Sequence, residues 1–128
     1  MKSQAKLRVL LVEDEPMIAM TAEDAIEALG FATVGPVAHL ADALELAAKG
    51  DFDCAILDIN IRGGTTYSVA DLLRARGCPF FFATGYSAWS IPEHLVNEKR
   101  LTKPFTSSAL EAELGLLHDR VRLKAKAG

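Results

Sequence analysis

The chain is poor in the residues that mark disulfide-rich, membrane or secreted proteins. Its 128 residues include only two cysteines, Cys54 and Cys78, which are too few for a disulfide framework and are not spaced as metal ligands. No apolar run is long enough to cross a bilayer, and the run near the N-terminus ends in acids, unlike that of a signal peptide. We therefore expect a reduced, cytoplasmic protein that makes no membrane contact.

Positive charge is also scarce. The formal net charge is −3, which argues against a general nucleic-acid-binding surface, and the sequence offers no recognition helix. The only basic run lies at the C-terminus, and we interpret it as a solvated tail; it contains Arg120, Arg122, Lys124 and Lys126. The length fits one compact domain. We predict an N-terminal tail over 1–6, one domain over 7–120 and a basic tail over 121–128.

Two further absences narrow the kinds of ligand and metal site that the chain could form. The sequence has no glycine-rich phosphate loop of the P-loop or dinucleotide type, so it gives no support for nucleotide binding. Its three histidines are scattered, without the spacing of metal ligands. A site built on histidine or thiolate ligands is therefore not expected.

What the sequence does contain is a regular alternation of apolar runs and amphipathic segments. The apolar runs predict strands over 7–13, 31–38, 54–59, 79–84 and 99–103. The amphipathic segments predict helices over 16–30, 39–50 and 65–77, a short helix within 85–98 and a final helix from about 106 through about Arg120. Gly35-Pro36 suggests an edge position or a bulge in the second strand. This order predicts an α/β fold, in which a βα unit repeats five times around a doubly wound parallel sheet.

Polar residues gather where the predicted strands end. Glu13 and Asp14 follow the first strand, Asp58 ends the third strand, Thr84 ends the fourth and Lys103 ends the fifth. In an open parallel sheet the carboxyl ends of the strands meet at one crevice, so we expect these side chains to converge. The sequence thus predicts a site of acids, a hydroxyl and an ammonium.

The residue types in this cluster favour phosphoryl chemistry assisted by a metal. Carboxylates without histidine or cysteine suit a hard cation with oxygen ligands, namely Mg²⁺, which would also relieve the repulsion within Glu13-Asp14-Glu15. An aspartate in such a site can attack phosphorus and form an aspartyl phosphate. Lys103 would add a positive charge, and the hydroxyl of Thr84 would donate a hydrogen bond to the phosphoryl group.

The combination of LLVED, LDIN, ATG and KPF along the chain resembles the receiver domain of two-component response regulators. The resemblance runs from about Leu7 to Arg120. It implies a flavodoxin-like (CheY-like) fold with strand order 2-1-3-4-5. It also implies that Asp58 is the phosphoacceptor and that Mg²⁺ is held by Glu13, Asp14, Asp58 and the backbone carbonyl of Asn60. Thr84 would be the switch hydroxyl, and Lys103 would pair with the phosphoryl group. The Lys103-Pro104 peptide is expected to be cis.

The sequence departs from the common receiver pattern at one position and follows a narrower pattern at another. Many receivers carry a switching aromatic residue three positions before the lysine, where this chain has Arg100. PFFFATGY resembles a subclass of mostly stand-alone receivers marked by Phe-Ala-Thr-Gly-aromatic. Our hypothesis is that Tyr86, just after the Thr, takes over part of the switching role.

The resemblance implies a single-domain response regulator, a signalling phosphoacceptor whose only catalysis is its own phosphotransfer and autodephosphorylation. The expected partners are a sensor histidine kinase as phosphodonor and an unknown downstream protein, unless the domain acts as a phosphate sink; we expect a monomer or weak dimer. One alternative is a receiver-like interaction module that is not phosphorylated in the cell. Another is a phosphatase of the haloacid-dehalogenase type, which would need a second Asp where Asp58-Ile59-Asn60 has Asn.

Overall fold

The computed structural model describes residues 6–85 and 91–127, and its order of elements follows the predicted alternation of strands and helices. The strands of the main sheet are β1 (Arg8–Val12), β2 (Ala32–Val37), β3 (Cys54–Asp58), β6 (Phe80–Thr84) and β7 (Arg100–Thr102). The α-helices are α1 (Pro16–Ala28), α2 (Leu40–Lys49), α3 (Tyr67–Ala75) and α4 (Ser107–Ala127). Among these residues, no helix is both long and apolar enough to span a bilayer.

The main sheet has the predicted topology. All of its pairings are parallel and its order is β2-β1-β3-β6-β7, which is 2-1-3-4-5 when only the strands of this sheet are numbered. The expectation for Gly35-Pro36 is also confirmed, because β2 is an edge strand whose register with β1 shifts between Leu10 and Val12. The Gly35-Pro36 and Lys103-Pro104 peptides are both cis, as predicted for the second.

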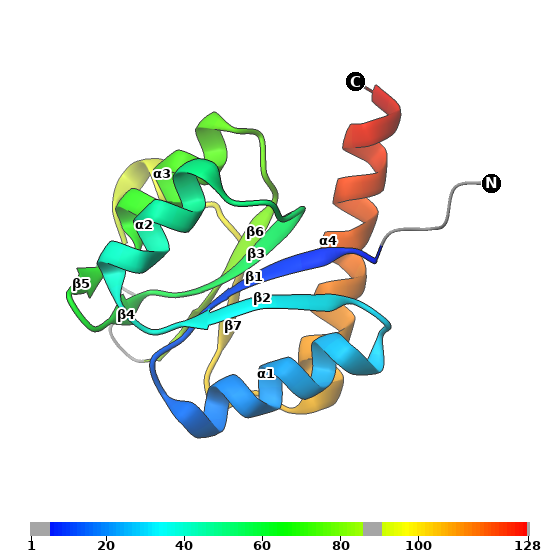
Figure 1. The fold of residues 1–128 in the computed structure, drawn as a ribbon, viewed down its shortest axis with the longest axis horizontal. Coiled ribbons are helices and arrows are strands. Elements are labelled where there is room, and N and C mark those ends of the chain that lie inside the picture. The colour runs from blue at the N-terminus through cyan, green and yellow to red at the C-terminus, as the bar shows by residue number, and fades with distance from the viewer. Residues whose placement is uncertain (1–5, 86–90, 128) are drawn as a thin grey trace.

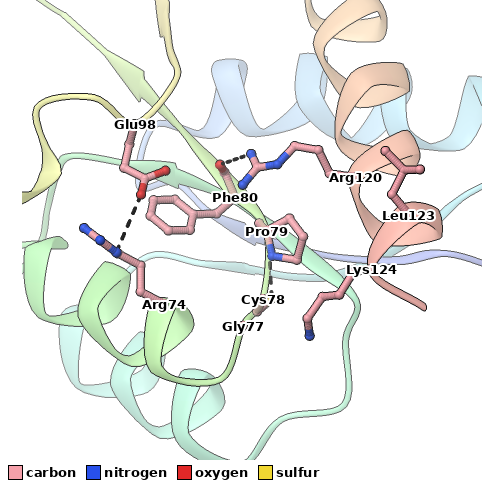
Figure 2. Close-up of a pocket in the computed structure, with 9 residues that line it drawn as sticks. All are labelled: Arg74, Gly77, Cys78, Pro79, Phe80, Glu98, Arg120, Leu123 and Lys124. Carbon is pink, nitrogen blue, oxygen red and sulfur yellow. Dashed lines mark hydrogen bonds and ion pairs between the residues drawn. The ribbon is translucent and has the colours of Figure 1, made fainter. Parts of the chain in front are cut away.

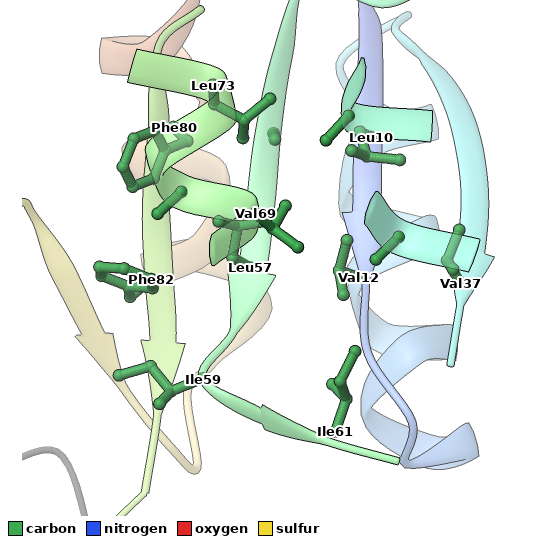
Figure 3. Close-up of a cluster of buried hydrophobic side chains, with 14 of the residues drawn as sticks. Leu10, Val12, Val37, Leu57, Ile59, Ile61, Val69, Leu73, Phe80 and Phe82 are labelled. Atoms are coloured by element: carbon green, nitrogen blue, oxygen red, sulfur yellow. The ribbon is translucent and has the colours of Figure 1, made fainter. Parts of the chain in front are cut away.

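Helices cover both faces of the sheet (Figure 1). Helices α2 and α3 pack on one face, and α1 and α4 pack on the other. Neighbouring strand residues alternate between the two layers, so that Phe80 and Phe82 enter one core and Phe81 enters the other. This arrangement explains why the strand sequences are continuously apolar. Figure 3 shows the core beneath α2 and α3, where Phe80 and Phe82 lie near Val69 and Leu73 of α3.

Two local predictions need correction. The segment between the predicted third strand and third helix forms a small antiparallel hairpin of β4 (Asn60–Ile61) and β5 (Gly64–Thr65), in which Gly63 and Gly64 have positive φ angles of 98° and 143°. The short helix expected within 85–98 is present, in the part that the structure describes, as the 3₁₀ helix η2 (Glu93–Leu95).

The final helix does not end near Arg120. Helix α4 continues to Ala127, because the sequence after Arg120 holds good helix formers and no glycine or proline before residue 128. The helix starts where the sequence predicts, and the hydroxyl of Thr106 caps it by accepting the backbone N–H of Ala109 at 3.0 Å. The basic residues near the C-terminus therefore belong to this helix, in which Arg122, Lys124 and Lys126 are exposed.

Candidate metal and phosphoryl site

The predicted site residues converge at the carboxyl edge of the sheet. Strands β1, β3 and β6 are consecutive neighbours, so Glu13, Asp58 and Thr84 leave the sheet side by side. Strand β7 pairs with β6, and the backbone N–H of Lys103 donates to the carbonyl of Thr84 at 2.7 Å. The sheet topology thus brings together residues that are far apart in the sequence.

Three carboxylates form a tight acidic cluster at this edge. One oxygen from each of Glu13, Asp14 and Asp58 lies within 4.8 Å of the other two. Glu13 is 4% exposed and Asp58 is 5% exposed, whereas Asp14 is half-buried. Burying like charges together is unfavourable unless a cation or a proton compensates them.

Lys103 supplies part of that compensation. Its Nζ lies 3.0 Å from Glu13 Oε1 and 3.0 Å from Asp58 Oδ2, and its side chain is only 12% exposed. Nζ also lies 3.3 Å from Glu15 Oε1. Glu15 lies at the N-cap of α1, where its side chain is 60% exposed and contacts Lys103.

The directions of the pKa shifts indicate that the ammonium of Lys103 alone does not neutralise the acidic cluster. Burial, and then the charge of Asp58, raise the pKa of Glu13 to about 7, against the opposing hydrogen bond from Lys103. Burial also raises the pKa of Asp58, although the contacts with Glu13 and Lys103 oppose the rise. Burial alone would lower the pKa of Lys103, but the hydrogen bond to Glu13 and the charge of Asp58 raise it overall. The acids therefore favour a proton or a cation.

The donor set fits the hard cation that the sequence predicts. Oxygen ligands in a compact carboxylate cluster suit Mg²⁺ or Ca²⁺, and the cluster of Glu13, Asp14 and Asp58 contains no nitrogen or sulfur ligand. Asn60 begins β4, directly after the turn that follows Asp58, so its backbone lies next to this cluster in the chain. The residues present are thus suited to hold Mg²⁺.

Thr84 occupies a buried position beside the acids. It is 3% exposed, and its hydroxyl donates to the carbonyl of Gly85 at 3.2 Å. The register pairs Asp58 with Ala83, so Thr84 lies one residue further along the neighbouring strand. The hydroxyl is therefore close to the phosphoacceptor candidate and engaged only with the adjacent backbone.

One residue of the site was missed by sequence reasoning. Thr66 is fully buried, its hydroxyl donates to the carbonyl of Asp58 at 2.7 Å, and its backbone N–H donates to the carbonyl of Ile59 at 2.8 Å. These bonds tie the start of α3 to the turn that carries Asp58. The available signal was a threonine in the first turn of a predicted helix, which is equally typical of an ordinary cap.

The two predicted switch positions have different outcomes. Tyr86 lies outside the described residues, so its role stays a prediction. Arg100 pairs in register with Phe82, and its exposed side chain donates to the carbonyl of Val96 at 3.1 Å. Arg100 therefore braces the turn before β7 from the outside of the protein.

Comparison with known proteins places this site in a family. The model of the response regulator receiver domain matches residues 9–114, a span that runs from β1 into the first part of α4 and holds every predicted site residue. The chain belongs to the response regulator receiver family. Receivers are domains of two-component signalling rather than classical enzymes.

Several relatives resemble this receiver along most of its length. The solution structure of SdrG from Sphingomonas melonis Fr1 is 43% identical, covers 90% of this chain and 98% of that chain, and has a TM-score of 0.77. A second structure is described as the BeF3-activated conformation of SdrG from Pseudomonas melonis Fr1, with 43% identity, the same coverage and a TM-score of 0.72.

A curated relative is longer than this chain. The phyllosphere-induced regulator PhyR of Methylorubrum extorquens is 31% identical over 113 residues, which are 81% of this chain and 40% of that protein. The receiver thus spans less than half of the length of that relative. What PhyR does as a whole protein does not transfer with the match.

Proposed function

We propose that this receiver accepts a phosphoryl group on Asp58 from the phosphohistidine of a sensor histidine kinase. The observation that carries the proposal is the contact of one lysine with two buried carboxylates, since Lys103 Nζ lies 3.0 Å from both Glu13 and Asp58. Such an arrangement places an aspartate nucleophile next to a positive charge and to further acids that suit a metal.

The transfer is a displacement at phosphorus. A carboxylate oxygen of Asp58 forms the new O–P bond while the N–P bond of the phosphohistidine breaks, and the electron pair returns to the imidazole nitrogen. Glu13, Asp14, Asp58 and the backbone carbonyl of Asn60 would hold Mg²⁺, which supplies charge neutralisation for the phosphoryl oxygens. Lys103 pairs with a phosphoryl oxygen, as its present contact with Asp58 favours.

Hydrolysis of the aspartyl phosphate would end the signal. A water molecule attacks phosphorus, the O–P bond to Asp58 breaks, inorganic phosphate leaves and the carboxylate is restored. Because the acidic cluster lies at the sheet edge and Asp14 is half-buried, water can reach this side of the site. The receiver would catalyse both steps on itself and no reaction on a released substrate.

The signal would spread through Thr84 and Lys103. The hydroxyl of Thr84 would leave the carbonyl of Gly85 and donate to the phosphoryl group, while Lys103 would exchange a carboxylate oxygen for a phosphoryl oxygen. Both residues flank the segment between β6 and β7, so we propose that this segment repacks and changes affinity for a downstream protein, unless the receiver serves as a phosphate sink. Arg100 faces outward, so we assign it no inward movement and keep Tyr86 as the candidate partner of Thr84.

The test is the intact mass of the protein after incubation with acetyl phosphate and Mg²⁺. We expect the mass of one phosphoryl group in the parent protein, no gain in Asp58→Asn and none when a chelator removes the metal. Asp53→Asn is a matched control, because Asp53 is an exposed acid on the opposite edge of the sheet and should leave the gain intact. No gain with acetyl phosphate or with any candidate kinase would contradict the proposal and favour an unphosphorylated interaction module.

A further inference from the structure

Two neighbouring hollows of the described chain lie at the amino edge of the sheet, opposite the acidic site. One, of about 430 Å³, lies between the C-terminal parts of α3 and α4, with Arg74 on one side and Arg120, Leu123 and Lys124 on the other (Figure 2). A second, of about 390 Å³, continues past the turn before β6 and adds Arg76 to the lining. We call the two together the basic cleft; they share Gly77, Cys78, Pro79 and Lys124.

The basic cleft holds cations that this chain does not neutralise. Arg74 is paired, since its Nε lies 3.7 Å from Glu98 Oε2. Arg76 donates only to backbone carbonyls, at 2.6 Å and 3.1 Å, and Arg120 donates to the carbonyl of Phe80 at 3.2 Å. Lys124 has no hydrogen bond or ion pair within the described residues. Three cations without a carboxylate partner therefore surround one cleft in a chain of net charge −3.

The two acids in the lining offset only part of this charge, because the lining holds four cations and two acids. Glu98 pairs with Arg74, and the carboxylate of Asp53 accepts the backbone N–H of Arg8 at 2.8 Å. The thiol of Cys78 stays neutral, because burial raises its pKa to about 11. The local field of the basic cleft is thus positive, and it favours an anionic partner.

An ordinary structural role explains some of these cations but not all. Arg74 and Arg76 lie at the C-terminal end of α3, where positive charge stabilises the helix dipole. Arg120 and Lys124 are four residues apart on α4, and both line the first hollow together with Leu123, which is 66% exposed. A free ammonium next to an exposed leucine on one helical face is not needed for the fold.

We propose that the basic cleft binds an acidic segment of a partner protein. Carboxylates of the segment would pair with Arg120 and Lys124, and an apolar side chain would pack against Leu123 and Pro79. A nucleic acid fits less well, because its continuous negative charge would meet an acidic protein with only a few free cations. A flat bilayer fits less well too, because the cations line a hollow between two helices.

The test uses a fluorescently labelled peptide of alternating glutamate and leucine as the probe, with anisotropy as the readout at low salt. We expect Lys124→Glu to weaken binding about tenfold and Lys124→Gln about fivefold. Arg62→Glu is the matched control: Arg62 is an exposed cation on the turn that follows β4, near the opposite edge of the sheet, and its replacement should change binding by less than about twofold. Lys124 is exposed and makes no hydrogen bond or ion pair within the described residues, so each variant should melt with the parent protein.

A map of the contact gives the second readout. In the ¹⁵N-labelled protein, the probe should shift the amide signals of Gly77 and Leu123 and leave those of Glu13 and Asp58 in place. Equal losses of affinity in Lys124→Glu and Arg62→Glu would overturn the proposal, since they would reveal attraction to net charge alone. A mixed-sequence oligonucleotide or an anionic vesicle that binds these residues more tightly than the peptide would overturn the assignment to an acidic protein segment. Because Asp58→Asn should bind the probe normally, this test is independent of phosphoryl transfer.

Discussion

Ionisation of Glu13 should destabilise the metal-free receiver. Glu13 is buried beside Asp58, and its pKa rises from 4.5 to about 7. The folded state therefore binds the proton more tightly than the unfolded state does. Stability is highest when Glu13 is protonated, falls as the pH rises from 4.5 to about 7 and stays low above that range.

The size of the effect follows from the same two values. The interval between 4.5 and about 7, at roughly 1.4 kcal/mol per pH unit, corresponds to about 3 kcal/mol. Asp58 has a pKa raised in the same direction, so the two carboxylates titrate as a pair and the loss belongs to both. Glu13→Gln places a neutral side chain of nearly the same shape at this position, and it should recover up to about 3 kcal/mol above pH 7.

The assay is urea unfolding of parent and variant, with a chelator present, at several pH values across this range. Glu27→Gln is the control, since Glu27 is an exposed acid of α1 and its replacement should change the free energy of unfolding by less than about 0.5 kcal/mol. Mg²⁺ should stabilise the parent more than Glu13→Gln, because the parent presents the complete acidic cluster. A variant that is less stable than the parent above pH 7 would refute the reasoning, since it would show that the attraction of Lys103 outweighs burial and repulsion.

Two further predictions concern the scaffold, and urea unfolding measures both. Phe81→Ala should cost about 3–5 kcal/mol, because the 1% exposed ring fills the core between the sheet and α4; a cost below about 1 kcal/mol would contradict that packing. Thr106→Ala should cost about 1 kcal/mol, because its hydroxyl accepts a backbone N–H at the start of α4 at 3.0 Å. Ser108→Ala, in an exposed residue of the same turn, is the control and should be nearly neutral.

The sheet and its strand order were predictable because the continuously apolar sequences of the strands indicate that both faces of the sheet are buried. RVLLV and FFFAT are apolar on both faces, which only a covered parallel strand explains, and the alternation with helices leaves few topologies. The hairpin after Asp58 was not predictable, since NIRGG has turn residues but almost no strand sequence. Its form depends on tertiary bonds, above all that from Thr66 to the carbonyl of Asp58. The end of α4 was missed because basic charge was taken for a tail, although the residues are good helix formers.

The location of the site was predictable for a different reason. Glu13, Asp58 and Thr84 each interrupt an apolar run at its carboxyl end, and the topology of a parallel sheet brings such ends together. The contacts of Lys103 were not predictable in detail, because the sequence does not show that one ammonium touches three acids, including Glu15. The orientation of Arg100 was also beyond the sequence, since it depends on the hydrogen bond with the carbonyl of Val96.

The buried polar side chains lie where the fold is less stable than it would be with apolar residues. Among the described residues, the buried polar or charged side chains are Glu13, Asp58, Thr66 and Thr84, and all four lie at or directly beside the carboxyl edge of the sheet. An apolar edge would be more stable, because buried carboxylates are costly even when a lysine contacts them. Lys103 is therefore held by three acids that compete for its ammonium, and added charge on Asp58 would change these contacts. Its backbone N–H is bonded to the carbonyl of Thr84 at the end of β6, so the proposed phosphorylation of Asp58 would act next to the segment between β6 and β7.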